Sequence, residues 1–264
     1  MKRNLIWIAS YPKSGNTWLR CIIYTALRGR LDLNELGKVV PAFNSVRTVE
    51  GRSHTSDLAD HCKNWLQAQR SIAESQWPSK TFLKTHNSAC RINDFLFPST
   101  EHTYKVVYIV RDPRDVATSY ARHFNCGVSN AISHMLNEKN IIHNERQAEF
   151  LSSWNNHVGS WMCLNVPTLV IRFEDLKSQT EVEIRRLFQF LNLKPVLSLP
   201  DLVKQTSFES LKSLERRNRF VESVQNKNFF WRGATGEYEK IKPTELVKMA
   251  DQFSEVMKRL NYDI

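Results

Sequence analysis

One segment near the N-terminus constrains the fold more than any other. A short apolar run, Leu5–Ala9, is followed by the loop Tyr-Pro-Lys-Ser-Gly-Asn-Thr-Trp at residues 11–18 and then by an amphipathic stretch. This order predicts a buried strand, a tight loop and a helix. Such a loop directs backbone N–H groups and a helix N-terminus toward one point, where an anion is favoured. The segment is therefore predicted to bind a phosphate group of a nucleotide.

The side chains of this loop support that prediction. Lys13 adds a positive charge, the hydroxyl groups of Ser14 and Thr17 add donors, and Trp18 offers a flat ring on which a base could stack. The common nucleotide loop reads Gly, four residues, then Gly-Lys-Ser/Thr, whereas here the lysine precedes the loop's single glycine. The usual kinase or ATPase signature is thus absent. The loop residues expected to bind the nucleotide are Lys13, Ser14, Gly15, Asn16, Thr17 and Trp18.

The rest of the chain alternates short apolar runs with amphipathic segments. The runs predict buried parallel strands at Asn4–Ala9, Thr81–Lys84, Lys105–Val110 and Thr168–Arg172. The amphipathic segments predict helices at Thr17–Arg28, Asp57–Ser71, Pro113–Phe124, Arg146–Leu164, Thr180–Leu191 and Thr244–Leu260. This alternation indicates an α/β fold with a central parallel sheet covered by helices on both faces. With no repeat or clear linker, residues 1–264 are predicted to form a single domain.

Distinctive polar residues fall where the predicted strands end. Lys13 follows the first strand, Lys84 and His86 end the second, Arg111 ends the third, and Phe173–Asp175 ends the fourth. Ligands of open parallel sheets bind at the carboxyl ends of the strands. We therefore expect these residues to share one site.

The charge balance indicates the kind of ligand. Lysine and arginine total 37 against 27 acidic residues, for a formal net charge of +10. Such a charge suits simple solubility, nucleic-acid binding or a polyanionic small ligand. The basic residues are dispersed and form no long tract, which favours the small ligand over nucleic acid.

Cysteine usage and hydropathy bear on the compartment. The five cysteines are an odd number without a Cys-x-x-Cys pair, which argues against a disulfide framework or a zinc site and fits a reducing cytosol. The N-terminal apolar run stops at Pro12, too early for a signal peptide, and no run approaches membrane-spanning length. The sequence therefore predicts a soluble, cytoplasmic protein that does not bind membranes.

His86 is the best candidate for acid–base chemistry. It sits at a strand end beside a lysine, and an ordinary histidine pKa suits proton removal near neutral pH. The other seven histidines are expected to be structural, and none shows metal-ligand spacing, so no metal is expected.

The segment 108–120 contains a candidate phosphate site. Arg111 leaves the third strand and Ser119 lies about two turns into the next helix, so a guanidinium fork and a hydroxyl can reach the same group. The alternative is a structural salt bridge between Arg111 and Asp115. Arg114 and Asp115 are expected to serve local pairing and capping.

These segments, in this order, resemble the cytosolic-type sulfotransferases, and the chain looks like a bacterial-like, small-molecule member. The loop at 11–18 resembles their donor loop for 3′-phosphoadenosine 5′-phosphosulfate (PAPS), which implies a P-loop-like sulfotransferase fold. Their Lys-x-His motif implies that His86 is the catalytic base and that Lys84 contacts the transferring sulfonate, with Lys13 also catalytic. Their Arg-x7-Ser motif implies that Arg111 and Ser119 bind the donor's 3′-phosphate.

Two later segments extend the resemblance. Thr206 and Phe208 match residues that hold the adenine, and Phe208 is expected to oppose Trp18 with the base stacked between the rings. Trp231, Arg232 and Gly233 match a late Arg-Lys-Gly motif that closes over the 3′-phosphate. Trp231 departs from that motif, because it replaces the first arginine.

A further departure lies at the end of the fourth strand. Phe173 stands where many relatives have a tyrosine that hydrogen-bonds the adenine, and phenylalanine has no group to do so. Both departures, at Phe173 and Trp231, concern residues that the resemblance assigns to donor binding.

The resemblance implies sulfonate transfer from PAPS to a hydroxyl or amine of a small-molecule acceptor, without a metal. Residues 41–79, with segments 87–98 and 125–145, are expected to build the acceptor pocket. Two other classes stay open: a kinase-like phosphotransferase that uses ATP and magnesium, and a non-catalytic nucleic-acid-binding protein. The short dimerisation motif of the animal enzymes is not present near 219–228, which leaves the oligomeric state open.

Overall fold

A computed structural model describes residues 3–43, 58–75, 80–144, 147–218, 220–223, 228–230, 233, 235–236, 238 and 241–264. Its centre is a parallel sheet in which the described strands follow the order β2-β1-β5-β8. The strands are β1 (Leu5–Ala9), β2 (Thr81–Thr85), β5 (Thr103–Val110) and β8 (Thr168–Arg172). Each lies where the sequence predicts a strand, and β1 sits between β2 and β5.

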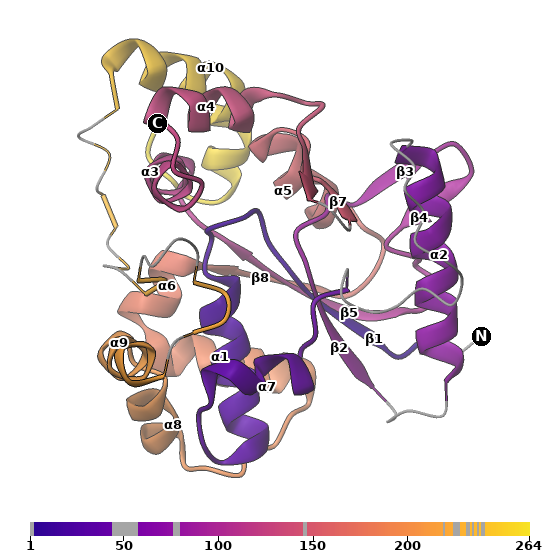
Figure 1. The fold of residues 1–264 in the computed structure, drawn as a ribbon, viewed down its shortest axis with the longest axis vertical. Helices are drawn as coiled ribbons and strands as arrows, with labels where there is room; N and C mark the ends of the chain where they lie inside the picture. Colours follow the sequence, from indigo (N-terminus) through magenta and orange to yellow (C-terminus); the bar gives the residue numbers. More distant parts are fainter. Residues whose placement is uncertain are drawn as a thin grey trace.

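Helices cover both faces of this sheet, as predicted (Figure 1). Side chains of β1 alternate between two apolar cores: Trp7 packs in one core and Ile8 in the other. The Ile8 side is covered by α1 (Asn16–Arg28), α6 (Phe173–Ser178), α7 (Thr180–Leu191), α8 (Leu199–Gln205) and α9 (Phe208–Arg217). The Trp7 side is covered by α2 (Leu58–Glu74), α3 (Pro113–His123), α4 (Val128–Leu136), α5 (Trp154–Met162) and α10 (Pro243–Arg259). Burial on both faces explains why the central strands β1 and β5 are nearly continuous apolar runs, whereas the edge strands β2 and β8 are only partly buried.

Prolines begin two of the helices. Pro113 opens α3 and Pro243 opens α10, where a missing N–H has no helical partner to lose. Asp112 caps α3, because its carboxylate accepts a hydrogen bond from the N–H of Arg114 at 2.9 Å.

One predicted helix is wrong in its first part. The helix expected over Arg146–Leu164 is replaced by β7 (Gln147–Phe150), which pairs antiparallel with β6 (Ile141–Asn144). The helix itself, α5, begins only at Trp154, after Ser153 in an extended conformation. Pairing with a neighbouring strand therefore overrides the helical pattern of these residues. Arg146, like Asp57 at the start of the predicted second helix, lies outside the described residues.

Several short elements have no counterpart among the predictions. They include the 3₁₀ helix η1 (Leu33–Lys38), the hairpin of β3 (Cys90–Ile92) and β4 (Phe95–Phe97), and the helices α4, α6, α8 and α9. The hairpin packs under α2 at one end of the molecule (Figure 1). No helix in the described ranges is both long and apolar enough to cross a membrane.

Candidate active site

The predicted phosphate loop joins β1 to α1. Lys13 and Gly15 adopt positive φ angles of 70° and 105°, which turn the chain sharply before the first helical residue, Asn16. A Cβ atom on Gly15 would lie 2.7 Å from a ring carbon of Phe173, so only glycine fits here. The side chain of Asn16 fastens the loop to the strand by donating to the carbonyl oxygen of Ile8 at 3.1 Å. The loop therefore holds its backbone and the start of α1 in one fixed arrangement.

A buried hydroxyl in this loop points to a ligand. The Oγ of Ser14 is buried and has no hydrogen-bond partner among the described residues. A buried polar atom left without a partner is costly, and an anion bound in the loop would satisfy it. Ser14 thus fits the nucleotide phosphate that the sequence predicts at this loop.

His86 lies just past the end of β2, beside the phosphate loop. Its Nδ1 is 2.8 Å from the carbonyl oxygen of Ser10, the residue that follows β1. A carbonyl only accepts, so we assign the ring proton to Nδ1, which leaves Nε2 with a free lone pair. Burial, followed by the positive charge of Lys84, holds the pKa of His86 well below its ordinary value. The imidazole is therefore neutral near pH 7, as a general base must be.

A second histidine holds the backbone of His86 in place. The Nε2 of His157 lies 2.9 Å from the carbonyl oxygen of His86, and its Nδ1 lies 2.8 Å from the hydroxyl of Tyr108. Burial lowers the pKa of His157 to about 4, so this ring is also neutral. The sequence offered no signal for this role, because His157 is far from His86 along the chain.

Two lysines contribute positive charge next to the base. Lys84 pairs in register with Ile8 of β1, and burial lowers its pKa, although the carboxylates of Glu149 and Glu222 act in the opposite direction. Burial, followed by the charges of Arg111 and Arg122, lowers the pKa of Lys13 to about 8. Mutual repulsion of these cations is the expected property of a site built for a polyanion.

Arg111 approaches the phosphate loop from the end of β5. Its Nη1 lies 3.4 Å from the carbonyl oxygen of Lys13, and its guanidinium carbon lies 4.6 Å from the ring centre of Phe173. Ser119 lies on α3, two turns further along, and is half-buried. The structure thus brings Arg111 to the loop, as predicted, and places Ser119 on the helix that begins beside it.

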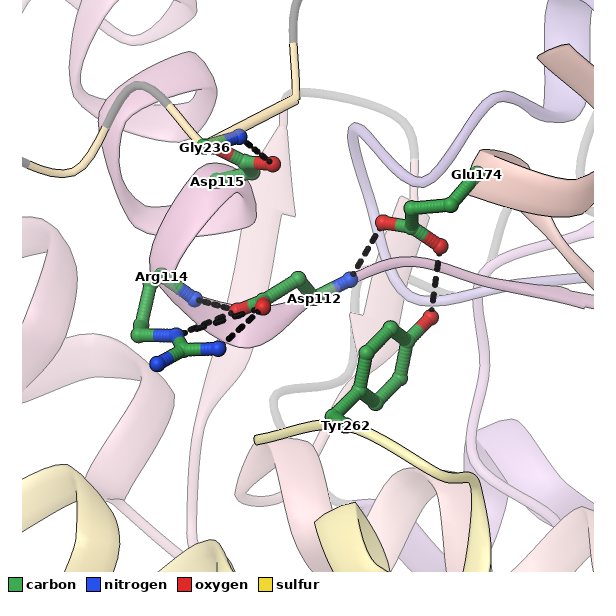
Figure 2. Close-up of polar contacts among 6 residues, drawn as sticks. All are labelled: Asp112, Arg114, Asp115, Glu174, Gly236 and Tyr262. Carbon is green, nitrogen blue, oxygen red and sulfur yellow. Dashed lines mark hydrogen bonds and ion pairs between the residues drawn. The ribbon is translucent and has the colours of Figure 1, made fainter. Parts of the chain in front are cut away.

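The residues after Arg111 connect this edge of the sheet to distant parts of the chain (Figure 2). Asp112 pairs with Arg114 at 2.6 Å, so the predicted local pairing of Arg114 is confirmed. Asp115 was predicted to form local contacts, but its carboxylate accepts a hydrogen bond from the N–H of Gly236, far along the chain, at 3.0 Å. Glu174 accepts from the N–H of Asp112 at 3.0 Å and from the hydroxyl of Tyr262 at 2.8 Å. These contacts anchor the late glycine segment and the C-terminus beside Arg111.

The aromatic residues expected to hold the base form a cluster. The rings of Trp18 and Phe208 meet edge to face, with centres 4.8 Å apart, and Trp18 is only 4% exposed. This geometry corrects the expected sandwich, because rings in direct contact leave no room for a base between them. The edge of one ring packs against the face of the other instead, and the indole N–H donates to the carbonyl of Thr206 at 2.8 Å.

The late glycine motif is described only in part. Gly233 packs against Phe208 so closely that a Cβ atom would lie 2.4 Å from the ring. Trp231 and Arg232 lie outside the described residues, as do residues 44–57 and 76–79 of the segment expected to build the acceptor pocket. Gly233 thus joins the late motif to the aromatic cluster at Phe208.

Glu222 is a site residue that the sequence did not indicate. It follows α9, and its carboxylate lies against Thr17 and Arg20 of α1. No motif marked it, and only folding brings this glutamate to the loop. Within the described residues, no group of three or more histidine, cysteine, aspartate or glutamate side chains could hold a metal ion.

The site as a whole defines a class of protein. Cations from three strand ends, a phosphate loop at a helix N-terminus and a neutral imidazole together form a nucleotide-dependent group-transfer site on an α/β sheet. Comparison with known proteins identifies the family. Residues 3–264 match the family model described as "Sulfotransferase domain", so the chain belongs to the sulfotransferase family and is an enzyme of sulfonate transfer.

Individual relatives agree with this assignment. Luciferin sulfotransferase from Photinus pyralis is 27% identical over 79% of this chain, although the match spans only 56% of that protein. Sulfotransferase 1E1 from Mus musculus is 26% identical over 93% of this chain and 80% of that protein. The crystal structure of retinol dehydratase with retinol and PAP matches all of this chain and 83% of that one, with a TM-score of 0.65 and 18% identity. The sulfotransferase fold predicted from sequence is confirmed, and neither the kinase-like nor the nucleic-acid-binding alternative is favoured.

Proposed function

We propose that this chain, acting as a single domain, transfers the sulfonate group of PAPS to a hydroxyl or amine of a small-molecule acceptor, with His86 as the general base. The observation that carries the proposal is the bond between His86 and Ser10. This bond places a neutral imidazole beside the phosphate loop. The buried Ser14 hydroxyl of that loop has no hydrogen-bond partner among the described residues and can donate to an anion. The base and the donor loop are therefore parts of one rigid unit.

We assign the donor's binding residues from the geometry of the site. The loop from Lys13 to Thr17 would hold the 5′ end, where PAPS supplies an activated sulfonate. Arg111, with Ser119 on α3, would hold the 3′-phosphate, because a guanidinium fork matches phosphate oxygens. PAP, adenosine 3′,5′-bisphosphate, is the product that PAPS leaves behind, and it is bound in the retinol dehydratase structure.

The adenine would lie against the aromatic cluster. Trp18, Phe173 and Phe208 have ring centres 4.8 to 6.2 Å apart. The base would stack on the outer side of this cluster. Phe173 contributes ring surface and no hydrogen bond, so adenine recognition rests more on stacking and on Thr206.

The catalytic steps assigned to this chain concern charge and one proton. Burial holds the pKa of His86 low, so the imidazole is unprotonated in the free enzyme. Its Nε2 can therefore take the proton from the acceptor. Lys13 and the loop N–H groups stabilise negative charge that grows on the departing phosphate oxygen. Lys84 stabilises the negative charge of the sulfonate oxygens. No step in this scheme requires a metal.

The test is a direct assay of the transferred group. Purified protein is incubated with PAPS and a panel of phenols, alcohols and amines that includes luciferin and retinol, and products are analysed by mass spectrometry for an added sulfonate. We expect at least one acceptor to gain the group and His86→Ala to slow the gain by about two to four powers of ten. A protein that binds ATP and magnesium, but neither PAPS nor PAP by calorimetry, would overturn the proposal.

A further inference from the structure

A carboxylate from a distant part of the chain contacts the end of the proposed donor loop. Glu222 follows α9, and its Oε2 accepts a hydrogen bond from the Thr17 hydroxyl at 3.3 Å. Its Oε1 lies 2.6 Å from the Nη1 of Arg20, one turn further along α1. A negatively charged group thus touches the helix start that the proposed function assigns to the donor.

The buried charge of Arg20 on α1 stabilises its contact with Glu222. Arg20 is only 3% exposed, and its Nε donates to the carbonyl of Val40 at 3.2 Å. A buried guanidinium needs an anionic partner, and Glu222 supplies one in this structure. Any group that displaced Glu222 would have to bring negative charge of its own.

The carboxylate also influences the cations of the site. The charge of Glu222 raises the pKa of both Lys13 and Lys84, against the larger effect of burial. These are the two lysines assigned to the 5′ end of the donor. The hydrogen bond with Thr17 places Glu222 at the helix start that the proposed function assigns to the same end.

The loop that carries Glu222 is held from its other side. The buried carboxylate of Glu215 on α9 accepts from the Ser223 hydroxyl at 2.8 Å and from the N–H of Phe230 at 3.0 Å. Ser223, which directly follows Glu222, is thus held by a side chain of α9, independently of the bond between Glu222 and Arg20.

We infer that Glu222 is an internal anion that occupies the place of the donor's 5′ sulfonated phosphate and must be displaced before the donor can bind. The inference rests on the proposed function and adds a residue that sets donor affinity. The Thr17 hydroxyl has one hydrogen to donate, so the carboxylate and the 5′ group compete for it. Competition is confined to the 5′ end, because Glu222 contacts the helix start and Arg111 belongs to the other end of the donor.

The test compares two nucleotides that differ only at the 5′ position. Adenosine 3′,5′-bisphosphate and adenosine 3′-monophosphate are titrated into wild type and Glu222→Gln by calorimetry. The amide keeps an oxygen that can accept from Arg20 and Thr17, but it loses the charge. We expect the bisphosphate to bind about tenfold more tightly to the variant, or more, and the monophosphate to change by less than about threefold. Glu209→Gln, an exposed change of the same charge on α9, is the matched control and should alter neither affinity.

Each other outcome has a definite meaning. If both nucleotides bind Glu222→Gln more tightly by the same factor, the effect is one of general electrostatics. If the bisphosphate binds the variant with unchanged or lower affinity, Glu222 is a structural residue. Either result overturns the inference. Wild type that binds PAP and transfers sulfonate in those cases leaves the proposed function intact. If Glu222→Gln does not fold, Glu222→Asp keeps the charge but withdraws it by one methylene, and a smaller tightening confined to the bisphosphate is expected. Failure of every variant to bind the bisphosphate overturns the inference and the proposed function together.

Discussion

The Nδ1 of His86 and the carbonyl oxygen of Ser10 lie 2.8 Å apart, which joins the proposed base to the strand that leads into the phosphate loop. The bond fixes both the tautomer and the direction of the ring, so Nε2 is the only nitrogen available to take a proton. Ser10 is buried, and its position at the end of β1 leaves the imidazole little freedom to turn. Base and donor loop are therefore expected to act as a unit.

His86→Ala should lower turnover by about two to four powers of ten, which is the usual contribution of a positioned general base. PAP binding should stay within about threefold of wild type, because His86 is assigned no donor contact. Turnover by mass spectrometry and PAP affinity by calorimetry separate the two effects. His134→Ala, which removes an exposed imidazole on α4, is the control. Unchanged turnover in His86→Ala would show that another group takes the proton.

The lowered pKa of Lys13 predicts a pH dependence of PAP binding. This ammonium has a pKa of about 8, so it is charged below that pH and loses its charge as the pH rises. PAP affinity should therefore be constant between about pH 7 and 7.5 and fall above pH 8. Calorimetry across pH 7 to 9.5 measures the fall, and Lys13→Arg should flatten it because arginine keeps its charge. The same fall in Lys13→Arg would assign the titration to another group.

The sequence predicted the parts of the fold that depend on local pattern. The central strands β1 and β5 are largely buried apolar runs, and the edge strands β2 and β8 are short runs rich in β-branched or apolar residues, so all four are recognisable without tertiary information. β7 was mistaken for helix because its short polar segment is set by pairing with β6, a contact that no local pattern reports. The same reason explains the missed hairpin of β3 and β4.

The residues of the site fall into the same two groups, those that a local pattern predicts and those that tertiary packing brings in. Lys13, His86 and Arg111 were predicted because each follows a strand, and parallel strands bring their carboxyl ends to one edge. Glu222 and His157 were missed because they reach the site from other elements through tertiary packing. The edge-to-face contact of Trp18 and Phe208 was also beyond prediction, since a motif names residues without fixing the angle between their rings.

The bond between Asp115 and Gly236 predicts that α3 positions the late glycine segment. Asp115→Asn should weaken this bond by about 1 to 2 kcal/mol, because a charged acceptor is replaced by a neutral one. We expect PAP and adenosine 3′-monophosphate to bind about 5- to 30-fold more weakly, since the late segment resembles one that closes over the 3′-phosphate. Asp251→Asn, an exposed change on α10, should have no effect in the same titrations. Unchanged affinity for both nucleotides would separate this segment from the donor site.

Gly15 should be the most sensitive glycine of the donor loop. Its φ of 105° is strained for any other residue, and a methyl group there would lie 2.7 Å from Phe173 and 3.0 Å from Ile109. Both neighbours belong to buried, closely packed elements, so neither can withdraw without opening the aromatic cluster. Gly15→Ala should therefore lower the free energy of unfolding by about 2 to 4 kcal/mol, the sum of backbone strain and overpacking.

A second glycine provides the comparison for Gly15→Ala. Gly37 in η1 has open space around its Cα and no left-handed φ, so Gly37→Ala should change stability by less than about 0.5 kcal/mol. Urea unfolding followed by circular dichroism measures both variants. If Gly15→Ala folds at all, its PAP affinity should fall as well, because displacement of Phe173 also moves the guanidinium of Arg111 that lies over its ring. Equal stability of the two variants would mean that the loop and Phe173 are not packed as tightly as this geometry requires.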